Sequence, residues 1–374
     1  MRYLSFLCIS IVSYSKLGKC ALFCCLASLS LLVHSQQTGP ETKRSDMTVA
    51  DNQSFLAPLV KESLLLDVAQ TNTTVVVGER GHVLVGNLDQ QEQLTQVPVP
   101  TTVTLTAVDG FGDTFLAVGH DATILRSTDS GQTWEVVFSS VDLDRPFLDV
   151  SFINEQEAFA IGGYGLFMRS SDAGKTWEQV QHFSLLSPDD IEYLESLADD
   201  PEFYQEELNY IFPHFNRISR RGDAIYLVGE AGLIARSADY GNSWERYDID
   251  YFGSFFDARE LSNGQILAVG LRGNMFLRGD DGQWDRIESC ITTSLNSIVE
   301  QNDDVFVVGN NGVVLSLDPS QLSSNERAQT NNENCSGHIA LSKIDSAISS
   351  SITNAFMLDG VLSAVSANGI QPVE

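Results

Sequence analysis

The chain has 374 residues, of which 43% are hydrophobic and 9% aromatic, so it can bury one large core or two ordinary ones. It holds 22 Lys and Arg against 50 Asp and Glu, a formal net charge of −28. A chain this acidic repels phosphate backbones and anionic lipid surfaces, which argues against nucleic acid as a partner.

The first 35 residues have a composition of their own. Their charged side chains are few and all basic: Arg2, Lys16 and Lys19. An apolar run from Cys20 to Val33 follows and ends near the small residue Ser35, which is typical of a secretory signal. The alternative is a retained membrane anchor, which needs about 20 apolar residues. We expect a signal peptide at 1–35, a disordered linker at 36–53 and no membrane insertion after cleavage.

Seven copies of one pattern follow the leader, each an apolar run ending in Val-Gly or a variant, a short turn and a second apolar run. The first runs end at Gly78, Gly119, Gly162, Gly229, Gly270, Gly309 and Ser366. Most intervals are 39 to 43 residues, the size of one four-stranded propeller blade, and the runs lack helical spacing. The sequence predicts an all-β fold over 54–374, a seven-bladed β-propeller of four-stranded antiparallel blades.

An extra apolar segment, Phe55 to Val60, precedes the first blade. We expect it to form the outermost strand of the seventh blade and so close the ring, because closure removes exposed sheet edges. Two long intervals between blades place insertions at about 182–214 and 318–345.

Three blades continue into a Ser-x-Asp-x-Gly-x-Ser/Thr-Trp motif, and a fourth copy is one residue short. The Asp can accept N–H groups across its own turn, the Gly can take a positive φ, and the Trp can fill the gap between sheets. The expected structural residues are Ser127, Asp129, Gly131, Trp134, Ser170, Asp172, Gly174, Trp177, Ser237, Asp239, Gly241, Trp244, Asp280, Gly282 and Trp284.

This motif resembles the Asp-box, or bacterial neuraminidase repeat, and the Val-Gly turn before it resembles the repeat of the photosystem II stability and assembly factor family. The resemblance implies a non-enzymatic scaffold with structural Asp-boxes, which assists a membrane protein complex. In a non-photosynthetic host that complex could be an envelope transporter. The alternative is a sialidase-like carbohydrate-active propeller. Glycoside chemistry needs two carboxyl groups facing one bond, which argues against catalysis by Asp129, Asp172 and Asp239.

Propeller geometry places the Asp-box turns on one face, and the turns after Val-Gly with the blade connections on the other. We call them the box face (127–134, 170–177 and 237–244) and the connection face (78–83, 162–167 and 270–275). We expect both insertions on the connection face, and partner contacts there through Arg80, Tyr164 and Arg272. The dense basic cluster Arg217, Arg220 and Arg221 is a further candidate contact patch. Its alternative is internal pairing with the acidic insertion.

The first insertion carries nine acidic residues between Ser187 and Tyr210 and no basic one. Ser187-Pro188 and Asp200-Pro201 each match a helix start with a cap residue and Pro in the first turn, which predicts one or two short amphipathic helices. The insertion is either a solvated decoration or a docking element.

Beyond the leader, Cys290 and Cys335 are the remaining cysteines, and export to an oxidising periplasm or exterior would favour a disulfide between them. The alternative is two unrelated buried thiols. The sequence has no phosphate-binding loop, and its His and Cys residues lack ligand spacing, so we expect no cofactor and no metal. We expect the mature protein to be an exported monomer that binds a membrane protein or its assembly intermediate.

Overall fold

A computed structural model describes residues 53–86, 94–301, 304–322, 335, 337–358 and 361–373. All of these lie in one compact unit, 47–374. The expected signal peptide and nearly all of the expected linker, residues 1–52, lie outside the described residues. Among the described residues, no helix has the length and apolar character needed to cross a membrane.

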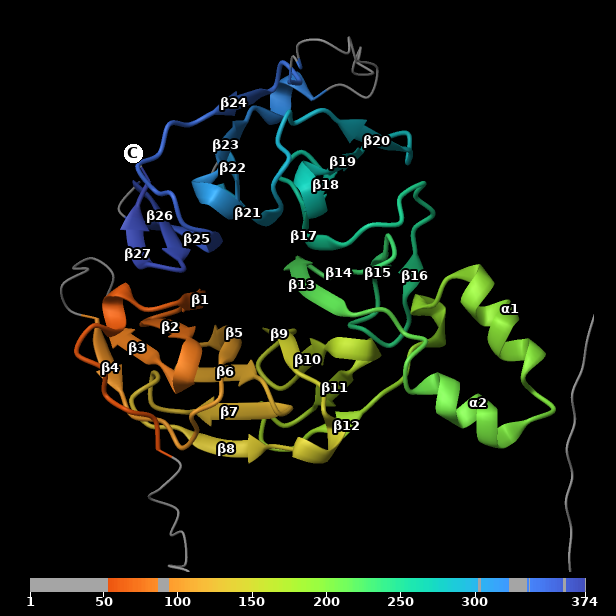
Figure 1. Ribbon diagram of the computed structural model, residues 1–374, viewed down its shortest axis with the longest axis horizontal. Coiled ribbons are helices and arrows are strands. Elements are labelled where there is room, and N and C mark those ends of the chain that lie inside the picture. The colour runs from red at the N-terminus through yellow and green to blue at the C-terminus, as the bar shows by residue number, and fades with distance from the viewer. Residues whose placement is uncertain are drawn as a thin grey trace, which may run out of the picture. The chain divides into compact units, whose positions relative to one another are not determined.

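Seven antiparallel sheets are arranged in sequence order around a central axis, which confirms the predicted seven-bladed propeller (Figure 1). Blades one to three contain β1 (Leu65–Gln70), β2 (Thr74–Gly78), β3 (Val83–Gly86), β4 (Thr95–Val97), β5 (Leu105–Phe111), β6 (Thr114–Gly119), β7 (Thr123–Ser127), β8 (Glu135–Phe138), β9 (Phe147–Phe152), β10 (Ala158–Gly162), β11 (Phe167–Ser170) and β12 (Glu178–Gln179). In each blade the first strand lies nearest the axis (Figure 1).

The remaining blades repeat this order, and the seventh has three strands among its described residues. Their strands are β13 (Phe215–Arg221), β14 (Ala224–Gly229), β15 (Ile234–Ser237), β16 (Glu245–Arg246), β17 (Phe255–Glu260), β18 (Ile266–Gly270), β19 (Met275–Arg278), β20 (Trp284–Ile287), β21 (Leu295–Gln301), β22 (Asp304–Gly309), β23 (Val314–Leu317), β24 (Leu341–Lys343), β25 (Ile352–Leu358), β26 (Val361–Ser366) and β27 (Gly369–Pro372).

The glycine that ends each second strand is required by a close backbone approach. A Cβ at Gly162 would lie 2.1 Å from the carbonyl oxygen of Pro146, which precedes the inner strand of the same blade. The same clash with the entering chain recurs at Gly78, Gly119, Gly229, Gly270 and Gly309. The Val-Gly repeat of the sequence therefore marks where each blade crosses its own entry segment.

Each Asp-box turn is a closed hydrogen-bonded unit. Asp172 accepts the Ser170 hydroxyl at 2.9 Å, the Thr176 N–H at 2.9 Å and the Thr176 hydroxyl at 2.7 Å. Gly174 has φ +80°, and a Cβ there would lie 2.4 Å from Leu116 of the preceding blade. The turn therefore packs directly against the preceding blade.

The other boxes repeat these contacts with small differences. The hydroxyl and N–H of Ser243 and the hydroxyl of Ser237 hold the pKa of Asp239 down to about 2. Asp129 is bonded in the same way by Ser127 and Thr133. The shortened box differs, because Asp281 rather than Asp280 accepts a turn N–H, from Gln283 at 3.0 Å. These carboxylates belong to separate turns, as their structural role requires.

Each of the seven blade junctions has its own buried apolar cluster. The box tryptophans pack in these clusters: Trp134 lies between blades one and two, and Trp244 between blades three and four. Trp134 and Trp244 therefore fill space between neighbouring sheets.

The expected closing strand at Phe55–Val60 does not form. A 3-10 helix, Val60–Glu62, follows an irregular stretch. The Gln96 side chain of β4 in blade one bonds the Ala57 N–H at 2.8 Å and the Phe55 carbonyl at 2.9 Å.

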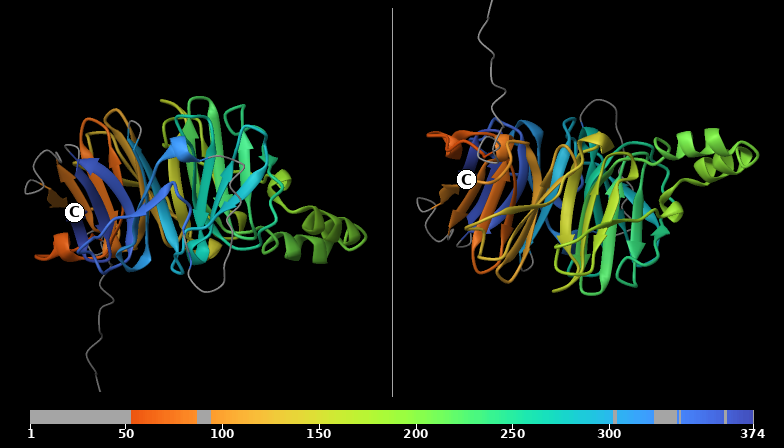
Figure 2. Two further views of the ribbon diagram at one scale, coloured as in Figure 1. Left: turned by 90° about the horizontal axis from the view of Figure 1, so that it is seen from above. Right: turned by 90° about the horizontal axis from the view of Figure 1, so that it is seen from below.

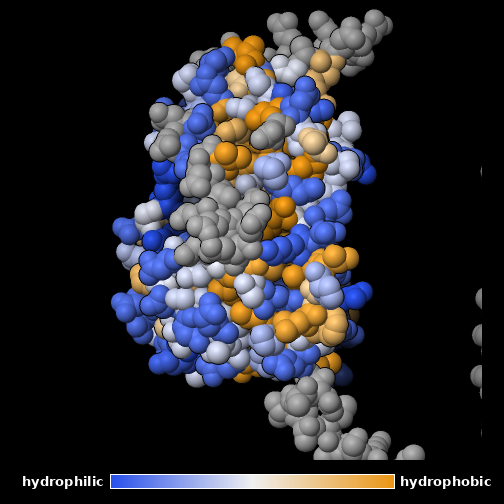
Figure 3. Space-filling view, turned by 90° about the vertical axis from the view of Figure 1, so that its left-hand side faces the viewer, coloured by the Kyte–Doolittle hydropathy of each residue, from blue (hydrophilic) through white to orange (hydrophobic). Residues whose placement is uncertain are grey.

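On the side of the molecule shown in Figure 3, hydrophobic residues occur as separate spots among hydrophilic ones.

The ring closes instead through a hydrogen bond that also joins blades two and three. The Thr353 hydroxyl of β25 donates to the Leu65 carbonyl of β1 at 3.1 Å, just as the Thr106 hydroxyl of β5 donates to the Phe147 carbonyl of β9 at 2.8 Å. Val60 and Leu65 share an apolar cluster with Phe356 of β25. No strand exchange between the chain ends is present among the described residues.

The first insertion contains α1 (Pro188–Ser196) and α2 (Pro201–Leu208), as predicted. The side chains of Ser187 and Asp200 cap their N-termini. It joins β12 to β13, so it belongs to the connection face, and the two helices extend outward from the blades (Figure 2).

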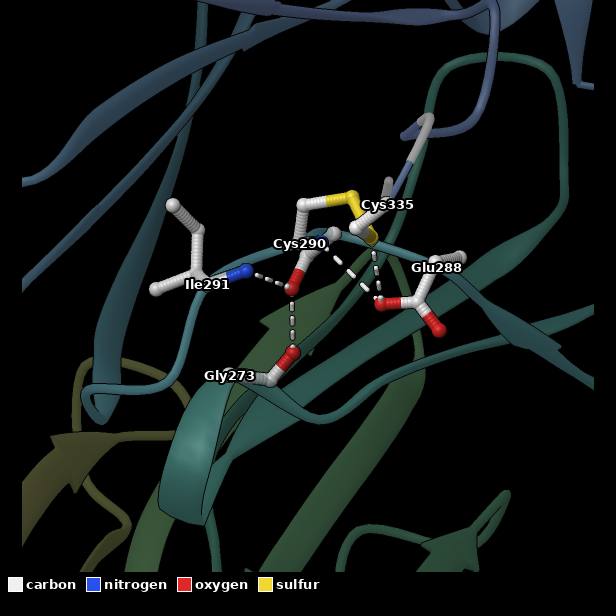
Figure 4. Close-up of a disulfide and its surroundings, with 6 residues drawn as sticks. Gly273, Glu288, Cys290, Ile291 and Cys335 are labelled. Carbon is white, nitrogen blue, oxygen red and sulfur yellow. Dashed lines mark hydrogen bonds between the residues drawn. A yellow bond between two sulfur atoms is a disulfide. The ribbon is translucent and has the colours of Figure 1, made fainter. Parts of the chain in front are cut away.

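The second insertion joins β23 to β24, the position that Asp-box turns occupy in other blades. It therefore leaves blade six on the box face rather than on the connection face as expected, although its described end at Cys335 lies beside the connection-face end of β20. Cys335, which precedes β24, forms a disulfide with Cys290, which follows β20 of blade five (Figure 4). The Cα atoms are 5.8 Å apart, and the His338 N–H also bonds the Glu288 carbonyl at 2.8 Å. The bridge ties two neighbouring blades together.

Candidate functional site

A pocket of about 350 Å³ lies at the propeller axis, bounded by the inner strands. Its lining comes mainly from the second halves of β5, β9 and β13, with contributions from β1, β17 and β25. Inner strands run from the connection face towards the box face, because each is followed by a hairpin turn on the box side. The pocket is therefore on the box-face side of the channel.

The third residue of every inner strand contributes to a ring of side chains around the axis. These residues are Asp67, Ala107, Asp149, Arg217, Asp257, Ser297 and Asn354. The Arg217 guanidinium is 3.8 Å from the Asp67 carboxylate and 3.7 Å from that of Asp149. Asn354 donates to Asp67 at 2.5 Å and accepts the Ser297 hydroxyl at 2.7 Å.

Three aspartates of this axial ring join alternate blades to the next blade. Each accepts the N–H of the residue that follows the ring position in the neighbouring strand. The donors are Val108 to Asp67 at 2.9 Å, Ile218 to Asp149 at 2.7 Å and Ile298 to Asp257 at 2.8 Å. Because buried carboxylates need such hydrogen-bond partners, the primary role of the ring is to hold neighbouring blades together.

Two carboxyl groups of the pocket bind protons more tightly than usual. Burial raises the pKa of Asp149 to about 7, against the opposing effect of the Arg217 charge. Burial also raises the pKa of Asp109 to about 6, although its carboxylate accepts the N–H groups of Phe152 and Gly110. The pocket therefore carries less negative charge near neutral pH than its composition suggests.

The predicted patch Arg217, Arg220 and Arg221 is not a free surface patch. Arg217 belongs to the axial ring, Arg220 donates to the Ile153 carbonyl of the preceding blade, and Arg221 pairs with Glu300 of β21 at 2.5 Å. The expected alternative, pairing with the acidic insertion, is also absent from the contacts of the described residues. The three side chains share β13, whose end lies at the pocket and the box face.

The other predicted partner residues lie at the opposite face. Arg80, Tyr164 and Arg272 occupy the turns between second and third strands, each with a left-handed backbone at φ 51° to 57°. Tyr164 packs edge-on against Tyr210 and His214 at the base of the helical insertion. The two sets of predicted residues therefore cannot form one continuous contact surface.

The axial aspartates Asp67, Asp149 and Asp257 were not identified from the sequence. Each is the one acidic residue two positions after a large apolar residue that opens an inner strand: Leu65, Phe147 or Phe255. They recur in blades one, three and five. Comparing every second blade of the sequence could have found these aspartates. Aligning all seven blades hides them, because the intervening blades have other residues at this position.

One cluster has metal-ligating residue types, Glu288 with Cys290 and Cys335 (Figure 4). Because the two sulfurs are joined to each other, they are not thiolate ligands. Its Glu288 carboxylate instead accepts the Cys290 N–H at 3.1 Å.

Comparison with known proteins supports the fold and the resemblance. The profile of the family described as "Photosynthesis system II assembly factor YCF48" matches residues 87–197 and 139–252. None of the curated proteins matches the chain in sequence.

Three solved structures illustrate the likeness in fold. YCF48 bound to D1 peptide superposes with a TM-score of 0.58 at 14% identity, covering 85% of this chain and 94% of that one. YCF48 from Cyanidioschyzon merolae gives 0.58 at 16%, covering 85% and 97%. The WD40 propeller domain of Doa1 gives 0.55 at 12%, covering 86% and 96%. Taken with its Asp-box repeats and seven blades, the chain is similar to photosystem II assembly factor-like propellers, in sequence over residues 87–252 and in fold over the whole ring.

Proposed function

We propose that this protein is an exported, non-catalytic scaffold that binds a polypeptide segment of a membrane protein complex at its central pocket and assists assembly of that complex. The observation that carries the proposal is a set of three guanidinium groups, Arg217, Arg220 and Arg259, that line one pocket of a chain with net charge −28. These guanidinium groups already contact Asp67 and Asp149, the Ile153 carbonyl and Asp257. Each guanidinium has five N–H donors, so further donors, such as the Arg217 Nε–H, are left for backbone carbonyl and carboxylate oxygens of a ligand.

The relatives support a protein as the ligand. The matching family is described as an assembly factor, and one related propeller is solved with a D1 peptide bound. The apolar residues Phe111 and Phe152 at the pocket edge add contact area next to the arginines, a combination common at protein interfaces.

Photo-crosslinking tests the site directly. A benzophenone amino acid at Phe111, on the inner strand, should crosslink to a discrete polypeptide in membrane extracts of the native host. The matched control is Val136 on the outer strand of the same blade, with 42% exposure against 44% for Phe111. Equal labelling at both positions would reject the central pocket as the binding site.

The second candidate is a sialidase-like glycosidase, and one observation favours it: Asp109 and Asp149 line the same pocket with raised pKa values. Both carboxylates are already engaged by N–H donors that hold the blades together. We therefore expect no turnover of fluorogenic glycosides. Turnover that is lost in Asp149→Asn but retained in Asp129→Asn would overturn the scaffold proposal.

A further inference from the structure

The helical insertion contains an apolar groove that belongs to no blade. It has a volume of about 600 Å³ and lies between α1, α2 and the 3-10 helix Phe183–Leu185. Its apolar lining residues are Phe183, Ile191, Leu194, Ala198, Pro201 and Tyr204. A cavity of about 150 Å³ suffices to bind one benzene molecule, so this groove can take several large side chains.

The groove is held in place by the propeller. Leu185, Leu194 and Leu208 of the insertion are buried in the same cluster as Trp244 and Ile218 of blade four. The Arg246 guanidinium donates to the Leu185 carbonyl at 2.7 Å and to the Ala231 carbonyl at 2.9 Å. Because these contacts fix both helices to the blade, the groove is preformed and a ligand need not order it.

Its apolar surface is left partly in contact with solvent. Phe183 is 41% exposed and Ile191 is 37% exposed, and both line the groove. Exposed apolar surface of this kind, rimmed by polar residues, marks interaction sites.

The charged side chains of the insertion itself all have one sign. Residues 176–216 contain no Lys or Arg, while nine acidic residues lie between Ser187 and Tyr210. Asp190 and Asp200 cap the two helices. No ion pair involves any of the nine within the part of the chain that the structure describes. Glu195 lies in the groove wall itself.

We infer that this groove docks a basic amphipathic helix of a partner protein. Such a helix places apolar side chains at i, i+3, i+4 and i+7 in a groove, while its Lys and Arg side chains face the acidic rim. A second copy of this chain is disfavoured as the occupant, because two acidic rims repel each other. The inference goes beyond the proposed function, since the groove and the central pocket share no lining residue.

Peptide binding to the full chain tests this inference. The probe is a fluorescent helical peptide of Leu and Lys with all Leu on one face, and its control is the same composition scrambled so that no apolar face forms. We expect anisotropy titrations to show binding of the first peptide that is about tenfold tighter than that of the scrambled one. Equal affinity of the two peptides would reduce the effect to charge attraction and overturn the inference.

Point variants locate the site. Ile191→Ser and Glu195→Lys should each weaken binding by about tenfold. Val136→Ser and Glu178→Lys, exposed changes on outer strands of blades two and three, should leave it unchanged. Equal losses in the controls, or wild-type binding by both groove variants, would place the peptide elsewhere. Self-association of the wild-type chain that Ile191→Ser abolishes would assign the groove to a second copy and likewise overturn the inference.

Discussion

Trp244 shows how one side chain of the repeat joins two blades. It is 5% exposed and packs edge-on against Phe167 and His182, at ring-centroid distances of 6.1 and 6.2 Å. Trp177 holds the equivalent place between blades two and three but is only partly buried. The same motif position therefore contributes different amounts of buried surface in different blades.

Trp244→Ala should lower the free energy of unfolding by about 3–5 kcal/mol, the usual range for removing a buried aromatic side chain. Trp177→Ala should cost less, because part of that side chain remains in water when the protein is folded. Urea denaturation of both variants measures the difference. Equal losses would show that the box turn, rather than the depth of burial, sets the contribution of the tryptophan.

The raised pKa values of Asp109 and Asp149 predict a dependence of stability on pH. An acid whose pKa is higher in the folded state stabilises the fold fully below its unfolded pKa, and this contribution disappears as pH rises through the folded value. The folded values are about 6 and about 7. These two carboxyl groups should therefore lower the melting temperature between pH 5 and pH 8, by about 2 °C or more. His82 and His182, whose pKa values burial lowers, act in the opposite direction.

Asp109→Asn should flatten this dependence, because the amide does not titrate. The exposed change Asp142→Asn should keep the wild-type profile. Differential scanning calorimetry at the two pH values makes the comparison, and a steeper profile in Asp109→Asn would contradict the assignment.

At the scale of elements, the sequence predicted what is encoded locally. The two helices of the insertion were located by Ser187 and Asp200, because caps and following prolines act within one turn. The misplaced strand at Phe55–Val60 shows the limit. Pro58 lacks an N–H, a local warning against a strand, and the bonds to Gln96 depend on a residue about forty positions away.

The site was less predictable than the fold for the same reason. Basic residues on β13 suggested a surface patch, yet their partners Asp67, Asp149 and Glu300 come from blades one, three and six. The sequence shows that these arginines are close together in the chain. It does not show which distant carboxylates come next to them when the ring closes. The disulfide could be predicted because Cys290 and Cys335 are the only two cysteines after the leader.

The disulfide should stabilise the junction of blades five and six. It closes a loop with a sequence separation of 45 residues, and a bridge of this kind contributes about 2–4 kcal/mol, chiefly by restricting the unfolded chain. The double variant Cys290→Ser, Cys335→Ser should therefore melt at a lower temperature than wild type. Dithiothreitol should lower the melting temperature of wild type and leave the double variant unaffected; equal melting of both proteins would contradict a stabilising role.

For the whole molecule, the closing junction between blades seven and one uses the same hydrogen bond as the junction between blades two and three. Thr353→Val and Thr106→Val remove that bond with little change of shape. Each should cost about 1 kcal/mol and leave a single unfolding transition. A much larger loss in Thr353→Val, or a second transition, would reveal a special seam at the chain ends.

This uniform closure has a consequence for how the gene could be rearranged. If no junction is privileged, the polypeptide can be opened at another blade connection and its present ends joined by a short linker. A circular permutant that starts at β5 would keep every axial contact, including the Arg217 pairs. Each of these contacts joins blades that are adjacent in the ring or face each other across the axis, and the order of the blades along the chain does not change either relation.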